Sequence, residues 1–237
     1  MSNKISSYNK QTLEIGGKKI LRGTTSRVAL KISESFTGEE IFIPLQVRAA
    51  TEPGPCIFVS GAIHGDELNG PGIIHEMILD TELKLKSGTL ILAPVINLLG
   101  LERNSRYLPD RRDLNRCFPG SANGSLASRI AAIVFNEIVL KCDFGIDIHA
   151  AAAERTNYPN VRADLRDPLV RKLAKAFGTE LVVNGVGPLG SLRSEACKVG
   201  CASICFEAGE ILQVKKNVLH SGLIGVRNVL VEFGMLD

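Results

Sequence analysis

The segment CIFVSGAIHGDELNGPGIIHEMI, residues 56–78, carries the pattern that predicts the fold. It begins with a continuous apolar run of the kind found in strands that are covered on both faces. A glycine-rich turn follows. Pro71 then suits the first turn of a helix, in which Ile73, Ile74 and Met77 fall on one face. The segment therefore predicts a strand, a tight turn and a helix, which is the unit of a parallel sheet.

The same alternation continues through the rest of the chain. Short apolar runs predict strands at residues 89–97, 144–150, 180–185 and 202–209. Helical patterns occur at residues 126–141, 168–177 and 214–234. Two apolar runs within residues 24–50 predict an antiparallel pair at a sheet edge. We therefore expect an α/β fold with three layers, α/β/α, in which helices cover both faces of a mixed, mainly parallel central sheet.

Length and composition exclude several classes of protein. The 237 residues are 45% hydrophobic and 22% charged, which is ordinary for a globular protein, and we expect a single domain over residues 1–237 with a peripheral segment at residues 1–24. A net charge of +3 is too small to indicate a nucleic-acid partner. No stretch approaches the roughly 18 apolar residues of a membrane span, and the N-terminus lacks the apolar stretch of a signal peptide. We expect a cytoplasmic protein with no nucleic-acid or membrane partner, and the sequence is compatible with a homo-oligomer.

The six cysteines form no CxxC pair, so the sequence does not support a disulfide framework. Cys197, Cys201 and Cys205 recur at four-residue steps, which would suit a metal site. They lie in apolar sequence, however, where small core residues are the commoner explanation. We interpret these cysteines as buried thiols.

Polar side chains follow the predicted strands at the ends where a parallel sheet forms its ligand crevice. His64 and Glu67 follow the first of these strands, and Asn97 follows the second. His149 and Glu207 lie at the ends of two further strands. We expect these groups to meet at one rim of the sheet.

Two histidines and a glutamate can hold a catalytic zinc ion and leave a fourth position for water. The predicted ligands of one Zn²⁺ per chain are His64, Glu67 and His149. Asp147 lies on the same strand face as His149, where a carboxylate can orient the imidazole. Glu207 is the predicted general base, because zinc-activated water needs a carboxylate to accept its proton. Each signal is weak alone, since a His-x-x-Glu pair is more often a solvated turn.

The segment LERNSRYLPDRRDLNRCFPG, residues 101–120, carries five arginines among acidic residues. The interleaved acids make it a poor nucleic-acid patch. An arginine fork can bind a carboxylate, and a second arginine can polarise a scissile carbonyl. Arg106 and Arg116 are the predicted pair for these roles, and Asn115 would help to orient the substrate. Arg111 and Arg112, which lie between these two residues in the sequence, fit ordinary surface ion pairs.

Together these motifs resemble a known family. GAIHGDELNG, SRYLPDRRDLNRCFPG, DIHA and FEAGE, in this order, are similar to the succinylglutamate desuccinylase/aspartoacylase family, which is related to the zinc carboxypeptidases. The resemblance extends from about residue 25 to the end of the chain. It implies a carboxypeptidase-like α/β/α domain with one zinc ion held by His64, Glu67 and His149.

The resemblance also implies roles for the remaining site residues. Arg106 would contact the scissile carbonyl, Asn115 and Arg116 would bind the substrate carboxylate, and Glu207 would act as general base and then as general acid. We therefore expect a zinc-dependent hydrolase that cleaves the amide bond of a small carboxylate-bearing substrate, an N-acyl amino acid.

Two other functions stay open at this stage. A metallocarboxypeptidase acting on peptides or cell-wall fragments would use the same metal and the same arginine. A zinc-binding domain without turnover is the other alternative, because many members of the family carry a C-terminal β domain that we expect this chain to lack. Residues 151–164 are expected at the mouth of the pocket or in an ordinary surface loop, with Arg155 or Arg162 able to bind a second acidic group.

Overall fold

The computed structural model of the protein describes residues 13–34 and 37–237. Its main sheet has eight strands in the order β3-β4-β6-β5-β7-β10-β8-β9, and β1 and β2 form a separate hairpin. The strands are β1 (Leu13–Ile15), β2 (Lys18–Ile20), β3 (Thr24–Glu34), β4 (Glu40–Ala49), β5 (Glu52–Gly61), β6 (Ser87–Ala93), β7 (Phe144–His149), β8 (Asn157–Ala163), β9 (Leu181–Asn184) and β10 (Ala202–Gly209). The helices are α1 (Asn69–Leu79), α2 (Leu98–Leu101), α3 (Leu126–Glu137), α4 (Pro168–Phe177), α5 (Leu192–Lys198) and α6 (Lys216–Glu232), with short 3-10 helices η2 (Leu114–Arg116) and η3 (Val139–Lys141).

The centre of the main sheet is parallel. β6, β5, β7 and β10 pair in parallel, so the carboxyl ends of β5, β7 and β10 lie at the same edge of the sheet. The antiparallel pair expected within residues 24–50 is confirmed as β3 and β4, with β3 at one edge. At the other edge, β8 runs antiparallel to β10, and β9 runs parallel to β8. The predicted fold class, with its mixed and mainly parallel sheet, is confirmed.

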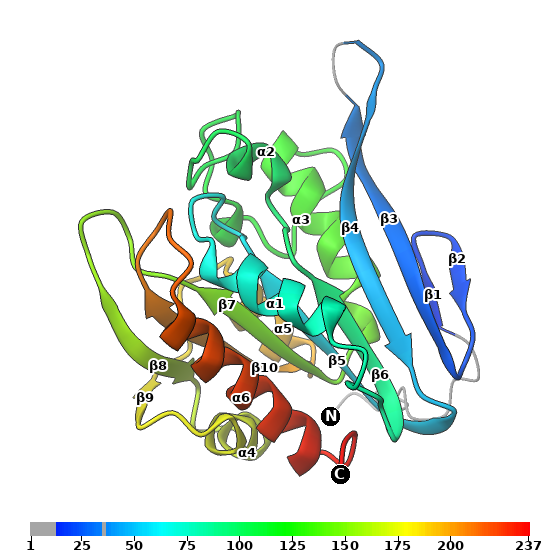
Figure 1. Ribbon diagram of the computed structural model, residues 1–237. Coiled ribbons are helices and arrows are strands. Elements are labelled where there is room, and N and C mark those ends of the chain that lie inside the picture. Colours follow the sequence, from blue (N-terminus) through cyan, green and yellow to red (C-terminus); the bar gives the residue numbers. More distant parts are fainter. Residues whose placement is uncertain (1–12, 35–36) are drawn as a thin grey trace.

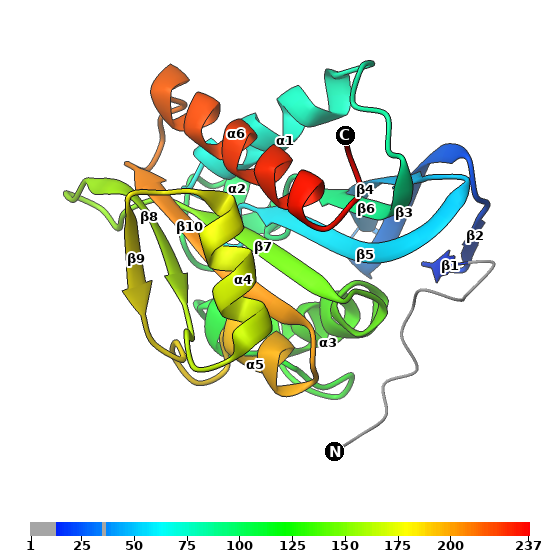
Figure 2. The ribbon, with the colours of Figure 1, turned by 90° about the horizontal axis from the view of Figure 1, so that it is seen from below.

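Helices cover both faces of the sheet (Figures 1 and 2). On one face, Ile73 of α1, Val170 of α4 and Val226 of α6 are fully buried in one apolar core. On the other face, Ile130 of α3 and Leu192 of α5 belong to a second core. Figure 2 shows α1 and α6 on one side of the sheet and α3 and α5 on the other. The functional rim therefore rests on strands that are packed on both faces.

The ends of two predicted helices follow their sequence signals. The side chain of Asp167 accepts hydrogen bonds from the first backbone N–H groups of α4, and α4 ends at Gly178, whose φ of 83° is left-handed. α6 ends two residues before Gly234, which also has a positive φ. Within residues 13–34 and 37–237, no helix combines the length and apolar character that crossing a membrane requires.

The elements that the sequence did not predict include β8 and α5. β8 lies within the segment expected at the pocket mouth or in a loop, and Pro159 interrupts its apolar character. Pairing with β10 and β9 makes this segment a strand. α5 has only seven residues, and Ser191 caps it by accepting a hydrogen bond from the backbone N–H of Ser194. Periodicity does not identify either element, because α5 is too short and β8 is too polar.

Residues 13–20 form the β1-β2 hairpin, which buries Ile15 and Ile20 in the core beside α3. Residues 1–12 of the segment expected to be peripheral lie outside the described residues.

β7 passes very close to its neighbours at Gly145. A Cβ atom on Gly145 would lie 2.3 Å from Cζ of Phe58 and 2.6 Å from Oγ of Ser203. Phe58 is 1% exposed, so its ring has no free space into which it could move. Asp147 and His149 follow on the same strand, which this close packing holds against its neighbours.

Replacing Gly145 with Ala is expected to lower the free energy of unfolding by about 1–3 kcal/mol, because the added methyl overpacks the core. Denaturant unfolding followed by circular dichroism measures the change. Gly185→Ala is the matched control, since a Cβ atom at Gly185 meets nothing within 4 Å, and its stability should stay close to that of the parent chain. Equal stability of the two variants would contradict the packing argument.

Candidate active site

The turn between β5 and α1 places His64 and Glu67 at the rim. Backbone segments approach this turn so closely that its glycines are needed: a Cβ atom on Gly65 would lie 2.1 Å from the carbonyl carbon of Gly100. The backbone N–H of Glu67 donates to the carbonyl of His64, which closes the turn. Asn69, which is fully buried, donates from Nδ2 to the carbonyl of Ala208 at the end of β10. The turn is thus tied to the neighbouring rim segments.

His64, Glu67 and His149 converge on one point. Nδ1 of His64 lies 2.7 Å from Oε1 of Glu67, and Nδ1 of His149 lies 3.0 Å from Oε2 of the same carboxylate. The backbone N–H of Ala150 donates to that second oxygen at 2.8 Å. The three residues are 2–4% exposed, and one ligand atom from each lies within 4.8 Å of the others. This group could hold a metal ion.

Strand register aligns a second row of groups beside His149. β7 and β10 are parallel, with Asp147 opposite Cys205 and His149 opposite Glu207. Because alternate residues of a strand share a face, these four side chains lie on the same face of the sheet. Arg162 of β8 is opposite Cys205 and extends the row.

Each imidazole also contacts a second carboxylate. Nε2 of His149 lies 2.7 Å from Oδ2 of Asp147, whose other oxygen accepts a hydrogen bond from the Ser60 hydroxyl at 2.7 Å. Nε2 of His64 lies 3.2 Å from Oδ1 of Asp113. A carboxylate on the far nitrogen holds the ring of a metal-binding histidine in orientation. Asp147 had been proposed for this position, whereas Asp113 had been given no role.

Arg106 lies beside the same group of side chains. One guanidinium nitrogen is 3.3 Å from Nδ1 of His64 and 3.5 Å from Oε1 of Glu67, and the other donates to Asp113 at 2.9 Å. A divalent cation bound by His64 and Glu67 would take over the first two contacts, while Asp113 would keep the guanidinium at the rim. Asn97 does not line the cavity. Its side chain caps α2, and its Nδ2 donates to the carbonyl of Arg106.

Glu207 has polar partners from β8 and β10. Nδ2 of Asn157 donates to Oε2 of Glu207 at 2.7 Å. Nε of Arg162 is 3.5 Å from Oε1, and Sγ of Cys205 is 3.7 Å from the same oxygen. These contacts hold the carboxylate beside His149, since the backbones of Glu207 and His149 are paired.

Asn115 and Arg116 lie in η2, directly after Asp113. The backbone N–H of Asn115 donates to Oδ1 of Asp113, and the side-chain oxygen of Asn115 accepts from the backbone N–H of Leu192. The guanidinium of Arg116 donates to the carbonyl of Asn115 at 2.7 Å. Within the described part of the chain, Arg116 forms no ion pair with a carboxylate, so its charge is available to a ligand.

The predicted metal ligands line one cavity of about 400 Å³, together with Asp147, Glu207, Arg106, Asn115 and Arg116. Five arginines face it, namely Arg106, Arg116, Arg155, Arg162 and Arg193. Arg193 was missed in the sequence because it lies on the unpredicted helix α5; it is 8% exposed and donates to the carbonyl of Gly185. Asn157 and Cys205 were also not singled out as cavity residues. The excess of guanidinium groups over the three acidic groups at the cavity makes it suited to anionic ligands.

Opposite charges keep the central groups ionised. Burial alone would raise the pKa of Glu67, but His149 and His64 outweigh it and hold that pKa well below its ordinary value. Burial would likewise raise the pKa of Asp113, but His64 and Arg106 lower it far more. Burial would lower the pKa of His149, yet Cys205, Asp147 and Glu67 hold it well above the ordinary value. The carboxylates of Glu67 and Asp113 therefore stay ionised beside positively charged groups.

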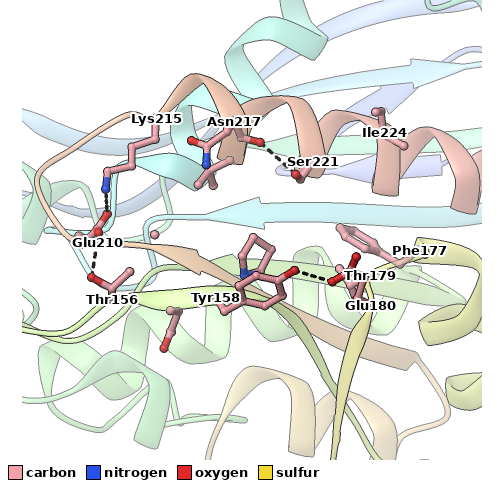
Figure 3. Close-up of a pocket in the computed structure, with 15 residues that line it drawn as sticks. Thr156, Tyr158, Phe177, Thr179, Glu180, Glu210, Lys215, Asn217, Ser221 and Ile224 are labelled. Atoms are coloured by element: carbon pink, nitrogen blue, oxygen red, sulfur yellow. Dashed lines mark hydrogen bonds and ion pairs between the residues drawn. The ribbon is translucent and has the colours of Figure 1, made fainter.

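Figure 3 shows a second cavity, of about 530 Å³. Asn157 belongs to the lining of both this cavity and the first. The polar groups of the second cavity are largely paired with one another. Glu210 lies between Lys215 and Thr156, and the hydroxyl of Tyr158 donates to Glu180. Neither of the two metal-capable groups found among the described residues lies in it. We therefore assign the chemistry to the smaller cavity.

The fold and the site define an α/β domain with a buried group of metal-binding character beneath an arginine-lined cavity. A sequence profile described as the succinylglutamate desuccinylase/aspartoacylase catalytic domain matches residues 53–233. Because the match covers more than half of the chain, the protein belongs to this family of deacylases. The predicted family is confirmed.

Individual relatives are more distant. The chain is 27% identical over 149 residues to an N-alpha-acetyl-L-2,4-diaminobutyric acid deacetylase of Halomonas elongata, a match that covers 60% of this chain and 43% of the relative. It is 25% identical to a product-bound structure of the ectoine utilization protein EutE (DoeB) from Ruegeria pomeroyi, with a TM-score of 0.82, covering 90% of this chain and 68% of that one. A metallo-carboxypeptidase from Burkholderia cenocepacia shares the fold at 16% identity, with a TM-score of 0.68, covering 87% of this chain and 64% of that one.

The donor set fits a zinc ion. Two imidazoles and one carboxylate form a ligand set known from catalytic zinc sites, and the carboxylate is already ionised. His149 would have to release its proton, because a metal binds the neutral imidazole.

Replacing His64 with Ala should abolish stoichiometric Zn²⁺ binding, because it removes one of three converging ligands. Elemental analysis after zinc loading and dialysis measures the metal content. The chain has four histidines, and His75→Ala is the matched control because His75 is exposed on α1 and should leave the content unchanged. Full metal content in the His64 variant would rule out this ligand set.

Proposed function

We propose that this protein is a zinc-dependent hydrolase that cleaves the amide bond of a small, carboxylate-bearing N-acyl amino acid. The observation that carries the proposal is the convergence of His64, Glu67 and His149 beside Glu207, in a cavity lined by five arginines. Family membership and the named activity of the Halomonas relative support the same reaction class.

His64, Glu67 and His149 would hold the zinc ion, and Asp147 and Asp113 would orient the two imidazoles. When bound, zinc polarises the scissile carbonyl and lowers the pKa of water. The protein's contribution at this point is orientation: both Nδ1 atoms face the carboxylate of Glu67, so the donors are arranged before any substrate arrives.

Glu207 is the proposed general base and then general acid. It would take a proton from the attacking water and return it to the leaving amine. Asn157 donates to one oxygen of this carboxylate and Arg162 lies near the other, which fixes its direction and leaves it facing the cavity. A carboxylate held in this way can serve both steps without a change of position.

The arginines are proposed to bind and polarise the substrate. Arg106 would stabilise the negative charge that develops on the carbonyl oxygen, since its guanidinium already lies within 3.5 Å of the ligand atoms of His64 and Glu67. Arg116 and Asn115 would bind the substrate carboxylate, and the contact of the Asn115 side-chain oxygen with the backbone N–H of Leu192 would hold Asn115 in position. A substrate with two anionic groups would also meet Arg155 or Arg162.

A substrate panel tests the reaction class. N-acetyl, N-succinyl and related acyl amino acids should release the acyl acid, whereas peptides should not lose a C-terminal residue. Peptide cleavage alone would favour the carboxypeptidase alternative. Stoichiometric zinc without cleavage of any amide would favour a binding domain without turnover.

Glu207→Gln should reduce the turnover number by at least about a hundredfold, because general acid–base catalysis contributes factors of roughly 10²–10⁴. Zinc content should stay unchanged, since Glu207 is not one of the proposed ligands. Glu210→Gln is the matched control: Glu210 follows on the same rim, lines the other cavity and is paired with Lys215, so the variant should keep its activity. Near-normal turnover in Glu207→Gln would remove Glu207 from the mechanism.

Arg116→Ala should raise the Michaelis constant roughly ten- to hundredfold, as expected for the loss of a charge-assisted contact of about 1.5–3 kcal/mol. The turnover number should change much less. Arg112→Ala is the control, because Arg112 is exposed and is not part of the cavity lining. An unchanged Michaelis constant for carboxylate substrates would argue against this role.

A further inference from the structure

A second set of metal-binding side chains lies beside the first. His149, Cys205 and Glu207 each offer one ligand atom within 4.8 Å of the others, and all three line the active-site cavity. The set follows from strand register, because Glu207 is paired with His149 and Cys205 lies two residues earlier on the same face of β10. Sγ of Cys205 is 3.7 Å from Oε1 of Glu207. Ligand atoms of one tetrahedral ion are roughly 3.5 Å apart, so small side-chain movements would close this set.

The chemistry of this set differs from that of the first. The first offers two imidazoles and a carboxylate, whereas the second replaces one imidazole with a sulfur. Soft metal ions prefer thiolate ligands, while harder ions prefer nitrogen and oxygen. The two sets should therefore select different ions.

The two sets share His149. Its Nδ1 faces Glu67, and its Nε2 is hydrogen-bonded to Asp147. An ion on the sulfur-containing side that takes Nδ1 of His149 would withdraw this ligand from the first set. It would also engage the carboxylate of Glu207.

We propose that His149, Cys205 and Glu207 form an alternative metal position that takes a thiophilic divalent cation such as Cd²⁺ and excludes Zn²⁺ from the position formed by His64, Glu67 and His149. The inference rests on the metal centre of the proposed function and extends it to the choice of metal. A cation in the alternative position would hold the general base and leave the protein inactive.

No other thiol among the described residues lies in this cavity beside a histidine and a carboxylate. Cys56 and Cys142 approach to 3.5 Å between their sulfur atoms, but both are buried in the core and neither lines the cavity. The thiol of Cys197 donates a hydrogen bond to the carbonyl of Ser203, and Cys197 does not line the cavity either. Cys205 is the thiol that a cation entering the cavity would meet.

The test is a Cd²⁺ titration of the metal-free full chain, monitored by the ultraviolet charge-transfer absorption of a cadmium–thiolate bond. The parent chain and the control Cys197→Ser should both develop the band as one ion binds. Cys205→Ser should lose it, and Cys205→Ala should behave in the same way. Circular dichroism verifies that each variant is folded. Absence of the band in the parent chain, or its persistence in the folded Cys205 variants, would overturn the proposal.

The shared histidine is tested by adding Cd²⁺ to the zinc-loaded chain and measuring released zinc. One zinc ion should leave for each cadmium–thiolate bond formed, and in Cys205→Ser any exchange should proceed without the band. Growth of the band with zinc fully retained would overturn the exclusion. Neither readout depends on hydrolysis. Normal zinc binding without the cadmium–thiolate band would refute only this inference. Failure to bind zinc at all would refute the proposed function.

Discussion

The buried carboxylate of Glu67 is the group on which the site depends. A charged side chain that is 2% exposed would cost several kcal/mol if it had no partner. Its partners come from two separate parts of the chain: His64 from its own turn, and His149 with the backbone of Ala150 from the end of β7. Charge pairing therefore fixes the turn after β5 against the end of β7, in addition to the packing of the strands themselves.

The same pairing orders the groups around it. Each imidazole places one nitrogen toward Glu67 and the other toward a second carboxylate, Asp113 for His64 and Asp147 for His149. The result is a chain of alternating acids and bases that ends at Arg106 on one side. Such a network holds both rings in orientation and gathers three carboxylates around the two imidazoles.

The parts of the site on regular elements could be predicted, and those on irregular segments could not. Asp147 was found because it is two residues before His149 on a strand. Asp113 contacts His64 in the same way, but it lies in an irregular segment just before η2. Such a segment has no repeating pattern that would predict where the side chain points. Arg193 was missed for a similar reason, since α5 is too short to show helical periodicity. Cys205 was correctly interpreted as buried, but that interpretation did not reveal that it borders the cavity.

The sequence by itself determined the alternation of the central strands with α1, α3, α4 and α6, the mainly parallel sheet, the family, and the residue types available for a metal site. These follow from periodicity, from turn signals and from motifs whose spacing is local. Only the tertiary structure decided which groups face one another. It pairs Glu207 with His149 and places Cys205 beside Glu207. It also brings Asn157, on a strand that the sequence did not predict, into contact with the carboxylate of Glu207. The physical reason is that register between strands distant in the chain is set by packing and hydrogen bonding across the whole sheet, for which no single segment carries a signal.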